Sequence, residues 1–110
     1  MIERLRRLPP FAACAGTLLL AAWPAAAAPH SYTVVIDKLK YGPVPAVLHK
    51  GDTIVWVNKD FLRHTATAVD HSFDVDLQSG ASGKTVLNKT GTIKFVCRFH
   101  PGMTGVLQVK

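Results

Sequence analysis

The chain has 110 residues, 48% of them hydrophobic, and its 13 Lys and Arg outnumber 7 Asp and Glu to give a formal net charge of +6. A chain of this length holds one small domain, which excludes a large or multidomain enzyme. The basic residues are scattered rather than clustered. This pattern argues against nucleic-acid binding and favours acidic protein partners.

The first 27 residues have the pattern of a secretory signal peptide. Three arginines within the first seven residues precede an apolar, alanine-rich stretch at 11–28, and Ala25 and Ala27 fit cleavage after position 27. We expect export to the periplasm and a mature domain of 83 residues, 28–110, whose ten Lys/Arg and six Asp leave a net charge of +4. No later apolar run is long enough to span a membrane, so stable insertion is not expected after cleavage. An uncleaved signal would instead act as an anchor.

A hydrophobic period of two residues dominates the mature chain and predicts short β-strands. Residues 53–57 are apolar on both faces, as in a central strand. The predicted strands cover 32–36, 46–48, 53–57, 64–69, 73–77, 85–87, 92–97 and 104–110, and the main turns lie at 41–45, 51–52, 58–63, 78–83 and 88–91. No segment has a convincing helical period. Seven or eight short strands separated by turns predict an all-β antiparallel sandwich.

Cysteine usage constrains the function most sharply. Cys14 lies inside the expected signal peptide, which leaves Cys97 as the one thiol of the mature chain. An internal disulfide is therefore excluded. A lone thiol in an oxidising compartment is expected either to be buried and inert or to be engaged in binding something.

Soft and imidazole ligands gather around that thiol. Cys97, His100 and Met103 fall within seven residues that contain a Pro-Gly turn, and His64 begins a predicted strand from which it can supply a fourth ligand. Thiolate and thioether sulfur favour copper, and imidazole suits both of its oxidation states. One Cys, two His and a weak Met form the ligand set of a blue-copper electron-transfer site.

With these residues the sequence resembles the cupredoxins, the small blue copper proteins. The Cys-x-x-His-x-x-Met spacing is similar to that of the amicyanin and pseudoazurin branch. Segments 51–58, 63–67 and 91–97 resemble the family strands that lead to or carry the ligands. The resemblance implies an antiparallel Greek-key β-sandwich of seven to eight strands that carries one type 1 copper ion.

The resemblance also implies a role for each ligand. His64, Cys97 and His100 would be the strong in-plane ligands and Met103 the long axial one, with electrons passing through the exposed edge of His100. Candidates for an apolar docking patch around that edge are Phe61, Leu62, Pro101 and Gly102. Thr65 departs from the family, in which Asn usually follows the first histidine and ties the two ligand loops together, so the second-shell bonding and the redox potential are open.

Other polar residues have weaker claims to a functional role. His30, His49 and His71 are expected in the N-terminal tail or in solvated turns. Asp74 and Asp76 share the outward face of a strand and have no nucleophile beside them, so carboxylate catalysis is not expected. Zinc could occupy such a site in a recombinant sample, but the thioether argues against zinc as its purpose.

The sequence therefore predicts a periplasmic, monomeric one-electron carrier that cycles between Cu(I) and Cu(II) and is not an enzyme, because four protein ligands leave no strong open position for substrate. Its partners would be redox proteins, such as a dehydrogenase, a cytochrome or a reductase, with an acidic docking face. Two alternatives stay open: a periplasmic copper carrier or storage protein, and a structural β-sandwich with a coincidental motif.

Overall fold

The protein is described here by a computed structural model that covers residues 15–19 and 28–110. Over these residues the fold is all-β, with eight strands: β1 (Ser31–Asp37), β2 (Lys40–Tyr41), β3 (Thr53–Asn58), β4 (His64–Ala68), β5 (Asp74–Leu77), β6 (Ser82–Val86), β7 (Gly91–Val96) and β8 (Thr104–Val109). Most of the expected signal peptide, Cys14 included, lies outside the described residues. Within the described ranges, no helix is long and apolar enough to cross a membrane.

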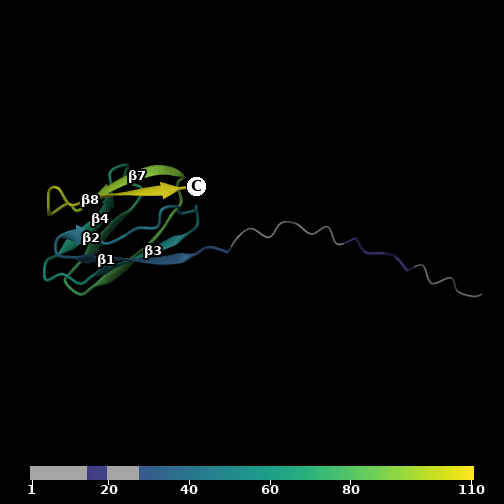
Figure 1. Cartoon of the computed structure of the whole chain (residues 1–110), viewed down its shortest axis with the longest axis horizontal. Coiled ribbons are helices and arrows are strands. Elements are labelled where there is room, and N and C mark those ends of the chain that lie inside the picture. The colour runs from purple at the N-terminus through teal and green to yellow at the C-terminus, as the bar shows by residue number, and fades with distance from the viewer. Residues whose placement is uncertain (1–14, 20–27) are drawn as a thin grey trace, which may run out of the picture.

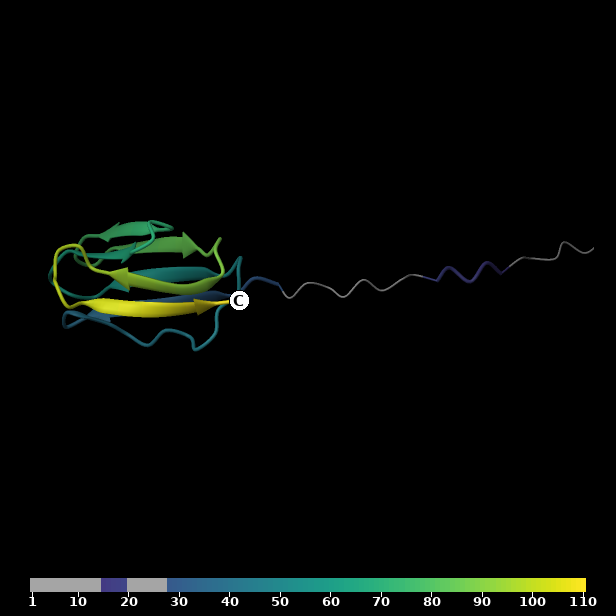
Figure 2. The ribbon, with the colours of Figure 1, turned by 90° about the horizontal axis from the view of Figure 1, so that it is seen from above.

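The strands form two four-stranded sheets that face each other (Figures 1 and 2). One sheet has the order β2-β1-β3-β6 and the other β5-β4-β7-β8. The predicted β-sandwich is confirmed. Among the described strands, one pair departs from the antiparallel pattern: β1 runs parallel to β3 along six residue pairs.

An aromatic cluster fills the space between the sheets. Phe95 and Trp56 are fully buried, with ring centroids 5.2 Å apart, and the Tyr41 ring lies 4.7 Å from that of Phe95. Gly105 stands opposite Phe95 in the β7–β8 pairing, and a Cβ at that position would lie 2.1 Å from the end of the ring. The absence of a side chain on Gly105 is therefore what lets the ring cross β8.

Three local predictions differ from the structure. Residues 46–48 do not form a strand, and only Leu48 makes an isolated bridge, parallel to Val109. Prolines at 43 and 45 remove N–H donors just before this segment. Lys40–Tyr41 pairs with the end of β1 as a short strand that the sequence pattern did not reveal. Strand β6 begins at Ser82, inside the predicted turn, because its first residues pair with β3.

The two connections that carry the predicted ligands lie at one end of the sandwich. The β7–β8 connection, residues 97–103, projects beyond the sheets at the end away from Lys110 in both views (Figures 1 and 2). The β3–β4 connection reaches the same end, because its last residue leads into His64, which contacts Cys97. The sandwich thus presents two loops side by side on a framework of paired strands.

Candidate metal centre

Three ligand-type side chains meet at this end: His64 begins β4, and Cys97 and His100 belong to the β7–β8 connection. The Nδ1 atoms of His64 and His100 are 3.1 Å apart. The sulfur of Cys97 lies 3.8 Å from Nδ1 of His64 and 3.5 Å from Nδ1 of His100. Among residues 15–19 and 28–110, no other group of three His, Cys, Asp or Glu side chains comes close enough to hold a metal ion.

The separation of these three atoms fits a bound metal ion. Zinc, as a guide, binds imidazole nitrogen at about 2.0–2.1 Å and thiolate sulfur at about 2.3 Å, so atoms that share such an ion are roughly 3 to 4 Å apart. The observed separations of 3.1, 3.5 and 3.8 Å fall in that range. One thiolate and two imidazoles are the donor types expected around copper.

The loop between the thiol and the methionine is closed by its own backbone. The Cys97 N–H donates to the Met103 carbonyl at 3.0 Å, and the Met103 N–H donates to the His100 carbonyl at 3.1 Å. Gly102 adopts a φ of +88° between them, a conformation that strongly favours glycine. Met103 is 5% exposed, so the loop returns its thioether side chain to the core at this end of the sandwich.

Cys97 is held in a form suited to metal binding. Its side chain is 4% exposed, and its sulfur accepts a hydrogen bond from the Thr65 N–H at 3.3 Å. Burial raises the pKa of the Cys97 thiol, but hydrogen bonds from the Thr65 amide, the His100 ring and the Phe99 amide outweigh burial and lower the pKa to about 6. The thiolate, which is the form that binds metals, is therefore the main form at neutral pH.

Asp60 orients the buried histidine from its far side. His64 is fully buried, and its Nε2 lies 2.9 Å from Oδ2 of Asp60. A proton on Nε2 that donates to this carboxylate leaves the Nδ1 lone pair free for a metal. The hydrogen bond from His64, followed by those from the Leu39 and Phe61 amides, lowers the pKa of Asp60. Three donors thus hold a charged acceptor behind the ligand.

Thr65 links the two ligand loops even though it is shorter than the usual Asn. Its hydroxyl accepts the Arg98 N–H at 2.9 Å and lies 2.9 Å from the Thr67 hydroxyl, which lies 2.7 Å from Asp74. Each hydroxyl carries one proton, so the arrangement fits a chain in which Thr65 donates to Thr67 and Thr67 donates to the Asp74 carboxylate. The link passes from the ligand loop through β4 to β5.

Comparison with known protein families agrees with this cluster of metal-binding residue types. The family model of the cupredoxin-like domain matches residues 10–109. The chain belongs to the cupredoxin-like family. No curated protein sequence matches it.

The solved structures that this cupredoxin resembles share its fold. An oxidised methionine-to-leucine mutant of amicyanin has a TM-score of 0.64 and 22% identity, over 72% of this chain and 81% of that one. A purple cupredoxin from Nitrosopumilus maritimus has a TM-score of 0.65 and 23% identity, over 72% of this chain and 99% of that one. The cluster of His64, Cys97 and His100, with Met103 in the same loop, can bind one copper ion.

The two ligand-bearing connections carry exposed apolar side chains. His64 and Cys97 are buried, whereas His100 is partly exposed, so the surface reaches the centre on the His100 side. Phe61 is 96% exposed and Phe99 is 42% exposed. The four residues predicted for a docking patch, Phe61, Leu62, Pro101 and Gly102, are all exposed and belong to the two ligand-bearing connections.

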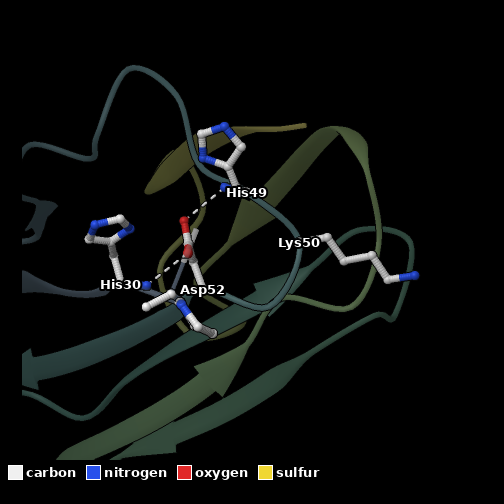
Figure 3. A pocket seen from close by; sticks show the side chains of 6 residues that line it. His30, His49, Lys50 and Asp52 are labelled. Atoms are coloured by element: carbon white, nitrogen blue, oxygen red, sulfur yellow. Dashed lines mark hydrogen bonds between the residues drawn. The ribbon is translucent and has the colours of Figure 1, made fainter. Parts of the chain in front are cut away.

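The other histidines of this cupredoxin lie outside the site, as predicted. His71 is exposed in the β4–β5 turn. His30 and His49 line a small pocket near the start of β3, where their backbone N–H groups donate to Asp52 at 3.0 and 2.8 Å. In Figure 3 both hydrogen bonds start from backbone nitrogens, and both imidazole rings extend away from the carboxylate.

Sequence reasoning missed the polar side chains that surround the ligands. Asp60 lies four residues before His64, which in hindsight is a signal for a supporting carboxylate. Asp74 and Asp76 do face outward, as predicted, but they form ion pairs with Arg98 and Arg63, which flank the ligands. The arginines next in sequence to His64 and Cys97 were the signal from which these ion pairs could have been predicted.

Proposed function

We propose that this cupredoxin is a type 1 copper protein that carries single electrons between redox partners and is not an enzyme. His64, Cys97 and His100 would bind the ion strongly, with the thioether of Met103 as a weaker fourth ligand. The observation that carries the proposal is the triangle of two Nδ1 atoms and one sulfur, with sides of 3.1 to 3.8 Å. When bound, copper supplies a centre that alternates between Cu(I) and Cu(II).

The chain's own residues would hold the proposed ligands in fixed positions around that centre. Asp60 and the Thr65 amide hold one histidine and the thiolate from outside the triangle. Paired strands on both sides hold the ends of the ligand loop. Ligands that do not move between oxidation states lower the reorganisation that electron transfer requires, which is the advantage of mounting a site on a rigid scaffold.

The surface supports a role in encounters with other proteins. Partners would approach the partly exposed His100 across the docking patch, which consists of Phe61, Leu62, Pro101 and Gly102. Lys38 and Lys59 lie near the same end, and neither forms an ion pair among the described residues. These charges support a redox partner with an acidic docking face, to which long-range attraction would steer the protein.

The proposed location is the periplasm. It rests on the signal-peptide pattern at 1–27 and on a domain whose strands begin at Ser31. We infer that the mature protein, 28–110, acts there as a monomer. Mass spectrometry of the protein exported by a bacterial host would test cleavage after Ala27, and a mature chain that retains the first 27 residues would contradict it.

Copper addition to the purified metal-free protein tests the function. An intense blue thiolate-to-copper absorption is expected at one equivalent, and Cys97→Ser should abolish it while His49→Ala leaves it intact. Reversible voltammetry with fast electron self-exchange would support the electron carrier. Rapid loss of copper to a chelator would favour copper delivery instead, and a colourless protein would contradict the type 1 site.

A further inference from the structure

Of three side chains next in sequence to the proposed strong ligands, two are arginines that both contact the third, an aromatic ring. These residues are Arg63, Arg98 and Phe99. The guanidinium carbon of Arg63 lies 4.6 Å from the centroid of the Phe99 ring, and that of Arg98 lies 5.6 Å from it. Both distances are within the range of cation–π contacts, about 6 Å. We call this group the aromatic clasp.

Two carboxylates of β5 anchor the clasp. Arg63 forms a bidentate ion pair with Asp76 through Nε and Nη2. Arg98 Nε lies 3.3 Å from Oδ1 of Asp74. Successive side chains of a strand alternate between faces, so these two aspartates, two residues apart, lie on the same exposed face of β5. Because both arginines are held from the strand, the aromatic ring that they contact is held as well.

Few hydrogen bonds of its own hold the β7–β8 connection in place, so the contacts of the clasp matter there. Between Cys97 and Met103 the backbone forms a tight turn through exposed Pro101 and Gly102, and His100 is the least buried of the three proposed strong ligands. Arg98 is already tied to Thr65 through its backbone N–H. No other described side-chain hydrogen bond or ion pair attaches the segment between Phe99 and Gly102 to a strand, apart from the metal cluster itself.

We propose that the aromatic clasp positions the ligand loop, with the Phe99 ring held by Arg63 and Arg98 so that His100 keeps one orientation. The three clasp residues are positioning residues, since they act on the metal through the ligands beside them. Their benefit to electron transfer rests on the proposed function, because a fixed His100 matters for redox chemistry only if copper is bound. The contacts themselves belong to the metal-free chain and can be tested in it.

The matched pair Phe99→Leu and Phe61→Leu isolates the clasp. Both phenylalanines are exposed and belong to the ligand-bearing connections, but within the described residues only Phe99 contacts guanidinium groups. In the metal-free protein, Phe99→Leu should increase amide hydrogen exchange at Arg98 and Met103, whose N–H groups donate to Thr65 and to the His100 carbonyl, by about fivefold to tenfold. Phe61→Leu should leave it unchanged. Phe99→Tyr, which keeps an aromatic face, should restore protection, and near-UV circular dichroism of buried Trp56 checks that every variant is folded.

The copper-loaded protein provides a second, spectroscopic measurement. Phe99→Leu should alter the blue absorption band and speed the loss of copper to a chelator by about tenfold, whereas Phe99→Tyr should match the wild type. Equal loop exchange and equal copper loss in Phe99→Leu and wild type would overturn the clasp, as would an equal effect of Phe61→Leu. If the wild type takes up no copper, the proposed function fails, and exchange in the metal-free protein still decides the clasp.

Discussion

The two ends of the sandwich use the same residue types in opposite ways. At the end described as the candidate metal centre, Asp60 accepts a ring N–H from His64, whose other nitrogen faces a second histidine and a thiol. At the far end, Asp52 accepts two backbone N–H groups, from His30 and His49. The first arrangement prepares imidazole nitrogens for a ligand, and the second uses histidine positions only as points of backbone attachment.

The difference shows that histidine and carboxylate content does not by itself make a metal site. The far-end aspartate is satisfied by the backbone and closes the junction between the start of β1 and the turn before β3. The near-end aspartate is satisfied partly by a ring, so its negative charge acts on a potential ligand. Substitutions at matched positions of the two ends should therefore have separable effects.

Removing one histidine from each end should give the largest contrast. His64→Ala should weaken copper binding by more than about 100-fold, since it deletes a ligand rather than a supporting contact, whereas His49→Ala should bind one copper as the wild type does. Copper at about 1,000 times its Kd should stabilise wild type and His49→Ala by about 4 kcal/mol. Titration calorimetry and thermal melts with and without copper measure both effects. Equal copper binding by the two variants would erase the distinction between the ends.

The two aspartates should separate affinity from stability. Asp60→Asn replaces a charged acceptor behind His64 by a neutral amide and should lower copper affinity about 10- to 100-fold. Asp52→Asn should leave copper affinity unchanged, because its partners are backbone amides remote from the site. Competition with a chelator of known affinity measures both variants, and a loss of affinity in Asp52→Asn would show that the ends are coupled.

Acid should reveal the structural role of the far-end aspartate. The hydrogen bond from the His30 amide, then that from the His49 amide, lowers the pKa of Asp52. An unfolded aspartate has a pKa of about 3.9, so the stabilisation is present above that pH and is lost as the pH falls through the lower folded pKa. Metal-free Asp52→Asn should melt several degrees below wild type at pH 7, and the gap should narrow below about pH 4. A gap that is constant with pH would contradict this role.

Lysines at the two ends should give the smallest contrast. Lys38 and Lys59 adjoin the connections near the proposed docking patch, whereas Lys50 lines the far-end pocket. With the anionic oxidant hexacyanoferrate and the Cu(I) protein, Lys38→Ala and Lys59→Ala should each slow oxidation about two- to threefold at low salt. Lys50→Ala should have no effect. Stopped-flow traces over a range of salt concentrations measure this, and equal slowing by all three would place oxidant access elsewhere.

Much of the framework and the cluster of candidate ligands could be predicted locally. Ile93, Phe95 and Cys97 alternate along the predicted strand 92–97, a pattern typical of one buried face, and they are 2%, 0% and 4% exposed. Cys97, His100 and Met103 share one loop because they are close in sequence, and His64 required only the start of a strand. Strand ends were less certain, as β6 shows, because pairing with β3 rather than local turn residues decides where it begins.

The sequence by itself determined the class of the fold, the ligand types and their spacing, because side-chain period and local separation are properties of short segments. Tertiary structure alone decided that β1 runs parallel to β3, that Asp60 stands behind His64 and that Arg63 reaches Phe99. Each of these features depends on where distant segments meet in space. A different strand register or side-chain rotamer would have left the same side chain in solvent. The candidate ligands could be predicted from the sequence, whereas the side chains that orient them came into place only when the two sheets packed together.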